Sequence, residues 1–177
     1  MSYDIGVYFG SEAFPEQAYR AFVASSLRLL GNWKCSESYG FDLRSDWKLH
    51  EYRIANALAA GFWDTENDVG VWVSLYRNRR EICDPAFRRF HYFVSVETGA
   101  GRSPRSMLIQ LLVALSAFDH FDDIIVEDLQ QDDPDNAVVY ARREEYLRHV
   151  IRLCRQWYGN DFLMKCGVID ANERLIL

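Results

Sequence analysis

The segment Glu97–Arg105 (ETGAGRSPR) is the first candidate for chemistry, because it places two glycines between a predicted strand and a predicted helix. A glycine turn before a helix N-terminus directs backbone N–H groups toward an anion, and Arg102 and Arg105 add positive charge. A phosphate group is therefore a candidate ligand. The segment lacks the third glycine of the dinucleotide fingerprint and the Gly-Lys-Ser/Thr of a P-loop. A tight turn followed by a helix cap accounts for the same residues without a ligand.

The same segment resembles the cofactor loop of acetyltransferases with the GNAT fold, which is also built from a strand, a glycine turn and a helix. The resemblance implies a small acyltransferase that binds coenzyme A at Gly99–Arg105. Val96 stands where that family usually has Gln or Arg, and Pro104 interrupts the usual run into the helix.

Two other groups of residues have side chains suited to catalysis. His120 lies between Asp119 and Asp122–Asp123, and carboxylate and imidazole groups are ligands for divalent metals. The same residues join a predicted helix to a predicted strand, where polar residues are expected in any case. Cys83 has no histidine tied to it by spacing, which gives no support to a cysteine nucleophile. We therefore predict no catalytic residue, no metal site and no cofactor.

The most unusual feature is an acidic segment, Asp119–Asp135, which holds eight carboxylates and no Lys or Arg. The whole chain has 26 acidic and 20 Lys or Arg residues, so this segment carries the entire negative excess. Helix capping and solubility explain only some of these acids, since the remaining self-repulsion has to be solvated or matched by a basic partner. We predict that the following residues bind such a partner: Asp119, Asp122, Asp123, Glu127, Asp128, Asp132 and Asp133.

The charge bias is reversed between Arg77 and Arg105, where seven arginines accompany only three acidic residues. The molecule is therefore expected to be bipolar. Its acidic side is expected to repel nucleic acid and to attract basic proteins.

Alternating and helical patterns predict the elements that must position these residues. Tyr3–Phe9 alternates as a strand with one buried face, and a helix follows from Pro15 until Gly31. A second helix is predicted from Asp46 to Ala60. Asp68–Tyr76 and Phe87–Thr98 are predicted as the two strands of an antiparallel hairpin.

The second half of the chain is predicted to begin with a buried helix, Pro104–Phe118, which is apolar on nearly every side. A short strand at Asp123–Asp128 follows. The pair Asp133-Pro134 is typical of a helix start, which predicts a long helix ending at Tyr158 before Gly159. One or two short edge strands are expected after Phe162. This mixture predicts an α+β fold, a mostly antiparallel sheet with helices packed against it, in a single domain spanning residues 1–177.

Composition agrees with a soluble globular protein, because 49% of the residues are hydrophobic and no window approaches the length of a membrane span. The N-terminus, MSYDIGVYFG, has no basic region followed by a long apolar run, which favours the cytoplasm over secretion. The four cysteines form no CxxC pair and are expected to be reduced thiols. A monomer or a homodimer is expected, with no membrane and no nucleic acid as partner.

The N-terminal part, about residues 3 to 78, resembles the family called immunity protein 52. The resemblance depends on short aromatic and glycine signatures: Tyr8-Phe9-Gly10, a helix with Ala18, Arg20 and Phe22, then Trp33, and the strand Gly70–Tyr76. It implies a cytoplasmic inhibitor that protects bacteria from a secreted toxin of the same system, and it names no catalytic residue. Three hypotheses thus remain open: an immunity protein that binds its cognate toxin with the acidic patch, a GNAT-like acyltransferase, and an adaptor subunit.

Overall fold

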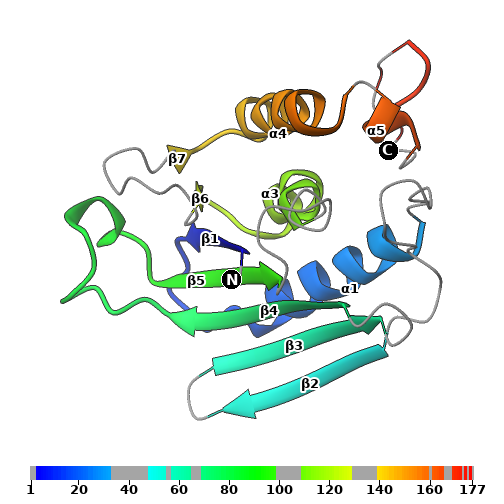
Figure 1. The fold of residues 1–177 in the computed structure, drawn as a ribbon. Helices are drawn as coiled ribbons and strands as arrows, with labels where there is room; N and C mark the ends of the chain where they lie inside the picture. Colours follow the sequence, from blue (N-terminus) through cyan, green and yellow to red (C-terminus); the bar gives the residue numbers. More distant parts are fainter. Residues whose placement is uncertain are drawn as a thin grey trace.

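The protein is an antiparallel sheet with helices packed against it, which confirms the predicted α+β class. The computed structural model describes residues 3–32, 48–54, 57–64, 69–98, 109–128, 139–159, 161–165, 169–172, 174 and 176. Its seven strands are ordered β2-β3-β4-β5-β1-β6-β7, and all neighbouring strands are antiparallel (Figure 1). The strands are β1 Tyr3–Phe9, β2 Lys48–Ile54, β3 Ala57–Asp64, β4 Val69–Arg77, β5 Tyr92–Thr98, β6 Ile124–Asp128 and β7 Val139–Tyr140.

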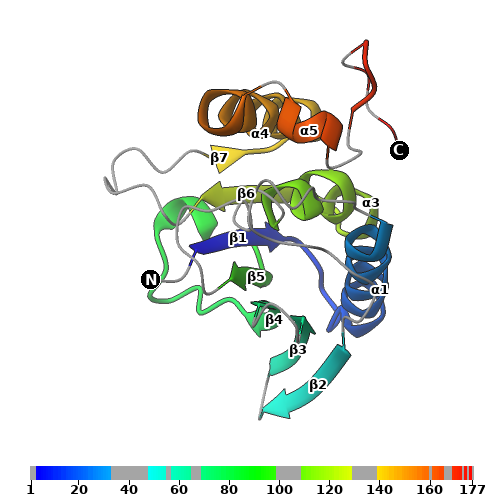
Figure 2. The same cartoon turned by 45° about the vertical axis from the view of Figure 1, so that its right-hand side comes forward.

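The longer helices lie on one side of this sheet and beyond its β7 edge (Figure 2). The helical elements are α1 Glu16–Asn32, η2 Pro85–Phe87, the π-helical turn η3 Val113–Ala117, α3 Phe118–His120, α4 Arg143–Tyr158 and α5 Asp161–Lys165. Residues 109–120 form one continuous helical segment, which packs between α1 and α4. The prediction of a central, buried helix is confirmed for this described part.

Alternation along the strands produces the core. In β1, Ile5, Val7 and Phe9 are buried, and the alternating residues of β4, β5 and β6 extend the same buried face. The helical segment covers this face with side chains that are nearly all inaccessible to solvent, including Ile109, Leu112 and the alanines of its π turn. In α1, the Tyr19 hydroxyl donates a 2.8 Å hydrogen bond to the Val73 carbonyl of β4, which satisfies a buried phenol.

The predicted helix Asp46–Ala60 is wrong, because most of this region forms the hairpin of β2 and β3. Its Ala, Leu and Glu residues favour a helix in isolation. Strand β4, however, has an edge with which β3 pairs over seven residues, from Asp64↔Val69 to Leu58↔Leu75. An unpaired edge of a sheet is a template for another strand, and this non-local pairing overrides local propensity.

Three predicted boundaries are also wrong. Helix α4 begins at Arg143, after Arg142 in extended conformation, so Asp133 does not cap it and Tyr140 belongs to strand β7. Strand β5 begins at Tyr92 because the chain first makes the η2 turn, whose N-terminus is capped by the Asp84 side chain. The one or two short edge strands expected after Phe162 do not begin there, because helix α5 spans Asp161–Lys165, and Ile169 forms an isolated β-bridge. Gly159 ends α4 as predicted, with φ of 80°.

Gln110 offers a test of the buried helical segment. Its side chain is 1% exposed, and neither amide atom has a hydrogen-bond partner among the described residues. A buried, unsatisfied polar group costs about 1–3 kcal/mol, so Gln110→Met, which keeps the length and removes the polar atoms, is expected to raise the free energy of unfolding by about 1–2 kcal/mol. Urea denaturation measures this change. The control Gln17→Met, at an exposed position of α1, is expected to be neutral. A less stable Gln110→Met would contradict the prediction.

Candidate functional site

In the described part of the acidic segment, two carboxylates have arginine partners from other parts of the chain. Asp119, in α3, forms an ion pair with Arg143 of α4, with 2.6 Å between Asp119 Oδ2 and Arg143 Nη2. The same guanidinium donates to the carbonyls of Ala114 and Leu115 at 3.3 and 2.9 Å. Arg143 therefore joins α4 to the end of the buried helical segment, and Asp119 balances its charge.

Asp122 and Asp123 form the turn between α3 and β6, and both are exposed. Asp123 has φ of 44°, a left-handed conformation that aspartate tolerates better than most residues. Its carboxylate lies 3.5 Å from Arg89, which follows the η2 turn. The acidic segment contains no Lys or Arg of its own. Folding brings Arg89 and Arg143 to it from other parts of the chain.

Glu127 and Asp128 lie on opposite faces of β6, as neighbours in a strand must. Asp128 is on the buried face and only 7% exposed, whereas Glu127 is half-buried on the other face. Asp132 and Asp133 lie outside the described residues. The seven predicted partner-binding residues are therefore divided between an exposed turn, two faces of a strand and a region that the structure does not describe.

The face of the sheet opposite α1 contains an arrangement that sequence reasoning missed. Cross-strand pairing places Tyr76, Phe93, Tyr8 and Ile125 in one row across β4, β5, β1 and β6. The ring centroids of Tyr8 and Phe93 are 5.4 Å apart, and those of Tyr76 and Phe93 are 5.1 Å apart, both stacked. Phe87 of η2 stacks on Tyr8 with 4.3 Å between the ring centroids, so it covers the end of the aromatic row at β1.

A buried asparagine holds Phe87 in place. The Asn78 side chain donates to the carbonyls of Phe87 and Phe90 at 2.9 and 3.0 Å, and its backbone N–H donates to the His91 carbonyl. These bonds join the start of the loop between β4 and β5 to its end. The aromatic row is therefore built on rigid supports at the strand and at the loop.

Two further rows lie beside the aromatic row. Ser74, Ser95, Gly6 and Glu127 form the first of them, and the second contains Trp72, Glu97 and Asp4. We call the three rows together the outer sheet face. In β1, β4, β5 and β6 these rows contain three carboxylates and no Lys or Arg.

Two carboxylates of the outer sheet face, Glu97 and Glu127, have raised pKa values, and burial is the main cause of both. Asp4 and Glu97 are directly opposite each other on β1 and β5, where two like charges destabilise the pair. Burial, followed by a hydrogen bond and charge repulsion from Asp4, raises the pKa of Glu97. Burial also raises the pKa of Glu127, with a smaller effect from Asp84, while a hydrogen bond with Tyr8 opposes the change. A cation beside Glu97 or Glu127 would favour the charged carboxylate and lower its pKa.

The outer sheet face is suited to binding a basic group between aromatic side chains.

Within the parts of the chain that the structure describes, no three His, Cys, Asp or Glu side chains are arranged to hold a metal ion, so the alternative of a metal site at His120 gains no support. Cys83 is a free, half-buried thiol. The Gly99–Arg105 loop lies outside the described residues. No described helix is long and apolar enough to span a bilayer.

The sequence did contain one signal for this face. Alternation in Tyr3–Phe9 and Asp68–Tyr76 already separates Asp4, Tyr8 and Trp72 from the apolar residues of the core. Their assembly with Glu97 and Glu127 depends on strand order and register, which no local pattern specifies.

No family model, curated protein or solved structure matches this chain. The resemblances to immunity protein 52 and to the GNAT acetyltransferases therefore remain predictions.

Glu97→Gln tests how the raised pKa of Glu97 affects stability. Because folding raises the pKa of Glu97, the folded state binds this proton more tightly than the unfolded state, and stability is lost as pH rises through the raised pKa. Glutamine has no charge to lose. The melting temperature of the variant is expected to exceed that of the wild type at pH 7, and the difference is expected to shrink below pH 4.5, the ordinary pKa of glutamate.

Glu81→Gln, at an exposed loop position, is the matched control and is expected to show no such pH-dependent gain. A Glu97→Gln variant that is less stable than the wild type at pH 7, or that gains equally at all pH values, would show that Asp4 and Glu97 do not repel each other.

The contact between α4 and the helical segment is tested by comparing its two partners. Arg143→Met removes the donors to Ala114 and Leu115 as well as the ion pair, and is expected to cost about 1–3 kcal/mol of unfolding free energy. Asp119→Asn removes only an ion pair whose carboxylate is 56% exposed, and is expected to cost less than about 1 kcal/mol. Chemical denaturation compares the two. Equal costs would mean that the carbonyl bonds contribute nothing.

Proposed function

We propose that this chain is a cytoplasmic immunity protein, which binds a basic cognate toxin through the outer sheet face and neutralises it by direct contact. The single observation that carries the proposal is the opposed pair Asp4–Glu97 beside Trp72, on a sheet face where the short η2 turn stacks on Tyr8 and no described α-helix packs. Two facing carboxylates on a half-buried surface reduce the stability of the isolated chain. Lys or Arg side chains of a partner would convert this repulsion into attraction.

The surrounding side chains support a protein partner. Tyr and Trp are the residue types that most often dominate binding energy, because they bury a large area with little loss of conformational entropy. Tyr8 and Phe93 are already stacked and held in the sheet, so little ordering remains to be done on binding. A rigid aromatic row next to three carboxylates therefore suits a partner with exposed Arg or Lys residues among apolar ones.

The exposed part of the acidic segment has a second role in this proposal. Asp119 and Asp123 keep more than half of their side-chain surface exposed despite their ion pairs, and Asp122 lies beside them on the exposed turn. Such charges attract a basic partner over several ångströms and raise the association rate more than the affinity. Asp128 is buried, so we assign it to the fold of the β6 edge and leave it out of the variants below.

The proposal predicts that the two groups of carboxylates affect different rate constants. In the steering variant, Asp119, Asp122 and Asp123 are replaced by Asn, which is expected to slow association and to flatten its salt dependence. In the anchor variant, Glu97→Gln and Glu127→Gln are expected to weaken binding by about 2–5 kcal/mol, mainly through faster dissociation. Surface plasmon resonance with the protein encoded by the adjacent gene measures both.

The control variant, Glu144→Gln with Glu145→Gln, removes two exposed carboxylates of α4 and is expected to bind like the wild type. Circular dichroism melting of every variant separates lost contact from lost fold. Unchanged kinetics in both test variants would exclude the outer sheet face and the exposed turn as the binding surface. If the chain binds no such protein but binds acetyl-coenzyme A, the acyltransferase hypothesis replaces this one.

A further inference from the structure

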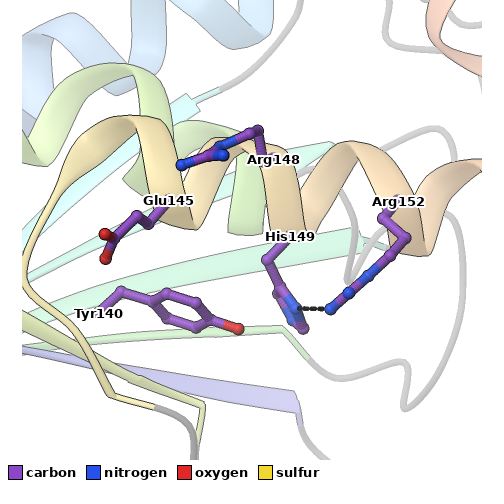
Figure 3. A pocket seen from close by; sticks show the side chains of 5 residues that line it. All are labelled: Tyr140, Glu145, Arg148, His149 and Arg152. Atoms are coloured by element: carbon purple, nitrogen blue, oxygen red, sulfur yellow. Dashed lines mark hydrogen bonds between the residues drawn. The ribbon is translucent and has the colours of Figure 1, made fainter.

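A second site, separate from the outer sheet face, lies between β7 and α4. It is a pocket of about 370 Å³ lined by Tyr140 of β7 and by Glu145, Arg148, His149 and Arg152 of α4 (Figure 3). Glu145 and His149 are four residues apart, as are Arg148 and Arg152, so the four helix residues lie along one side of α4. Figure 3 shows Tyr140 and His149 pointing toward each other from β7 and α4, with Arg152 reaching the imidazole ring from the next turn.

The hydrogen bond of His149 determines which ring nitrogen carries its proton. Arg152 Nη2 lies 3.2 Å from His149 Nδ1. A guanidinium only donates, so Nδ1 accepts and the neutral ring carries its hydrogen on Nε2. Burial and the charge of Arg152 lower the pKa of His149, although Asp128 opposes them, which favours this neutral form.

The Nε2–H donor of His149 has no acceptor. The residue is 9% exposed, and Nε2 has no hydrogen-bond partner among the described residues. A buried donor without an acceptor costs about 1–3 kcal/mol, and such groups are rare in native proteins unless a ligand or water satisfies them. The neighbouring ring of Tyr140, at 5.1 Å, is not an acceptor of comparable strength.

The other polar groups of the pocket are also mainly donors. Burial, with a smaller contribution from Asp128, raises the pKa of Tyr140 to about 12, so its hydroxyl stays protonated at neutral pH. Arg148 uses its Nε to donate to the Glu144 carbonyl at 3.2 Å, which leaves the terminal nitrogens of its guanidinium. Among the described lining residues, Glu145 alone is acidic against two arginines, and the Asp128 carboxylate lies near enough to raise the pKa of Tyr140 and to oppose the lowering of that of His149.

We propose that this pocket binds a small oxyanion, a phosphate or carboxylate group, with Arg148 and Arg152 supplying charge and His149 Nε2–H supplying a directed hydrogen bond. An oxyanion offers acceptors only, which complements a lining made of donors. Guanidinium groups match the planar or tetrahedral arrangement of such oxygens better than any other side chain. The inference does not depend on the proposed toxin-binding function, because none of these residues belongs to the outer sheet face.

The test titrates the full chain with inorganic phosphate and, separately, with acetate, at constant ionic strength set with sodium chloride. Nuclear magnetic resonance of the histidine ring nitrogens reports on the site directly. The resting ring is expected to be the Nε2–H tautomer, and one or both anions are expected to shift the Nε2 resonance with saturation. A stronger effect of phosphate than of acetate identifies a phosphate-bearing ligand, and the reverse identifies a carboxylate.

Substitutions locate the binding. Arg148→Gln and Arg152→Gln, at exposed positions of α4, are each expected to weaken anion binding at least about tenfold, as the loss of one charge-assisted hydrogen bond predicts. Glu145→Gln removes the opposing charge and is expected to strengthen binding. The control Arg174→Gln removes an equal charge outside the pocket and is expected to bind like the wild type. An Nδ1–H tautomer, no saturable shift with either anion, or equal binding by all variants would overturn the proposal.

Discussion

Burial of the helical segment 109–120 is the constraint on which the arrangement of this protein depends. Its side chains are apolar around almost the whole circumference, so it has to be covered on every side. The sheet covers one side, α1 and α4 cover others, and Phe121 at its end stacks on Phe9 of the first strand at 4.2 Å. Arg143 then ties α4 to the carbonyls near the end of the segment. Because α1 and this segment pack on the same face of the sheet, the opposite face is left without a described α-helix, and among the described helical elements only the short η2 turn contacts it.

The outer sheet face shows the clearest conflict between the stability of the fold and the binding function proposed for this face. A sheet face that only had to meet water would be expected to alternate charges of both signs across its strands. Here Asp4 faces Glu97, and in β1, β4, β5 and β6 the neighbouring rows bring aromatic rings and Glu127 but no Lys or Arg. Such local violations of folding rules are tolerated where function requires them. The exposed turn that contains Asp122 adds negative charge with less electrostatic repulsion, because the neighbouring Asp119 and Asp123 are paired with arginines.

The pocket at β7 and α4 follows from the same architecture in a different way. Tyr140 reaches α4 only because the short strand β7 pairs with β6 and brings the chain back to the sheet edge before the helix begins. Its ring packs against Tyr146 and His149, on successive turns of α4. Donors from two elements therefore converge there, beside the exposed carboxylate of Glu145.

The sequence by itself determined the α+β class, the limits of β1, the end of α4 at Gly159 and the buried character of the helix before Phe118, because these depend on local periodicity and on glycine conformations. It also separated Asp4, Tyr8 and Trp72 from the core. Only the tertiary structure decided the rest. The edge of β4 turned a segment with helical propensity into the β2–β3 hairpin, and folding supplied Arg89 and Arg143 to an acidic segment that has no base of its own. The outer sheet face and the α4 pocket both combine residues far apart in the chain, so strand register and helix docking had to bring them together.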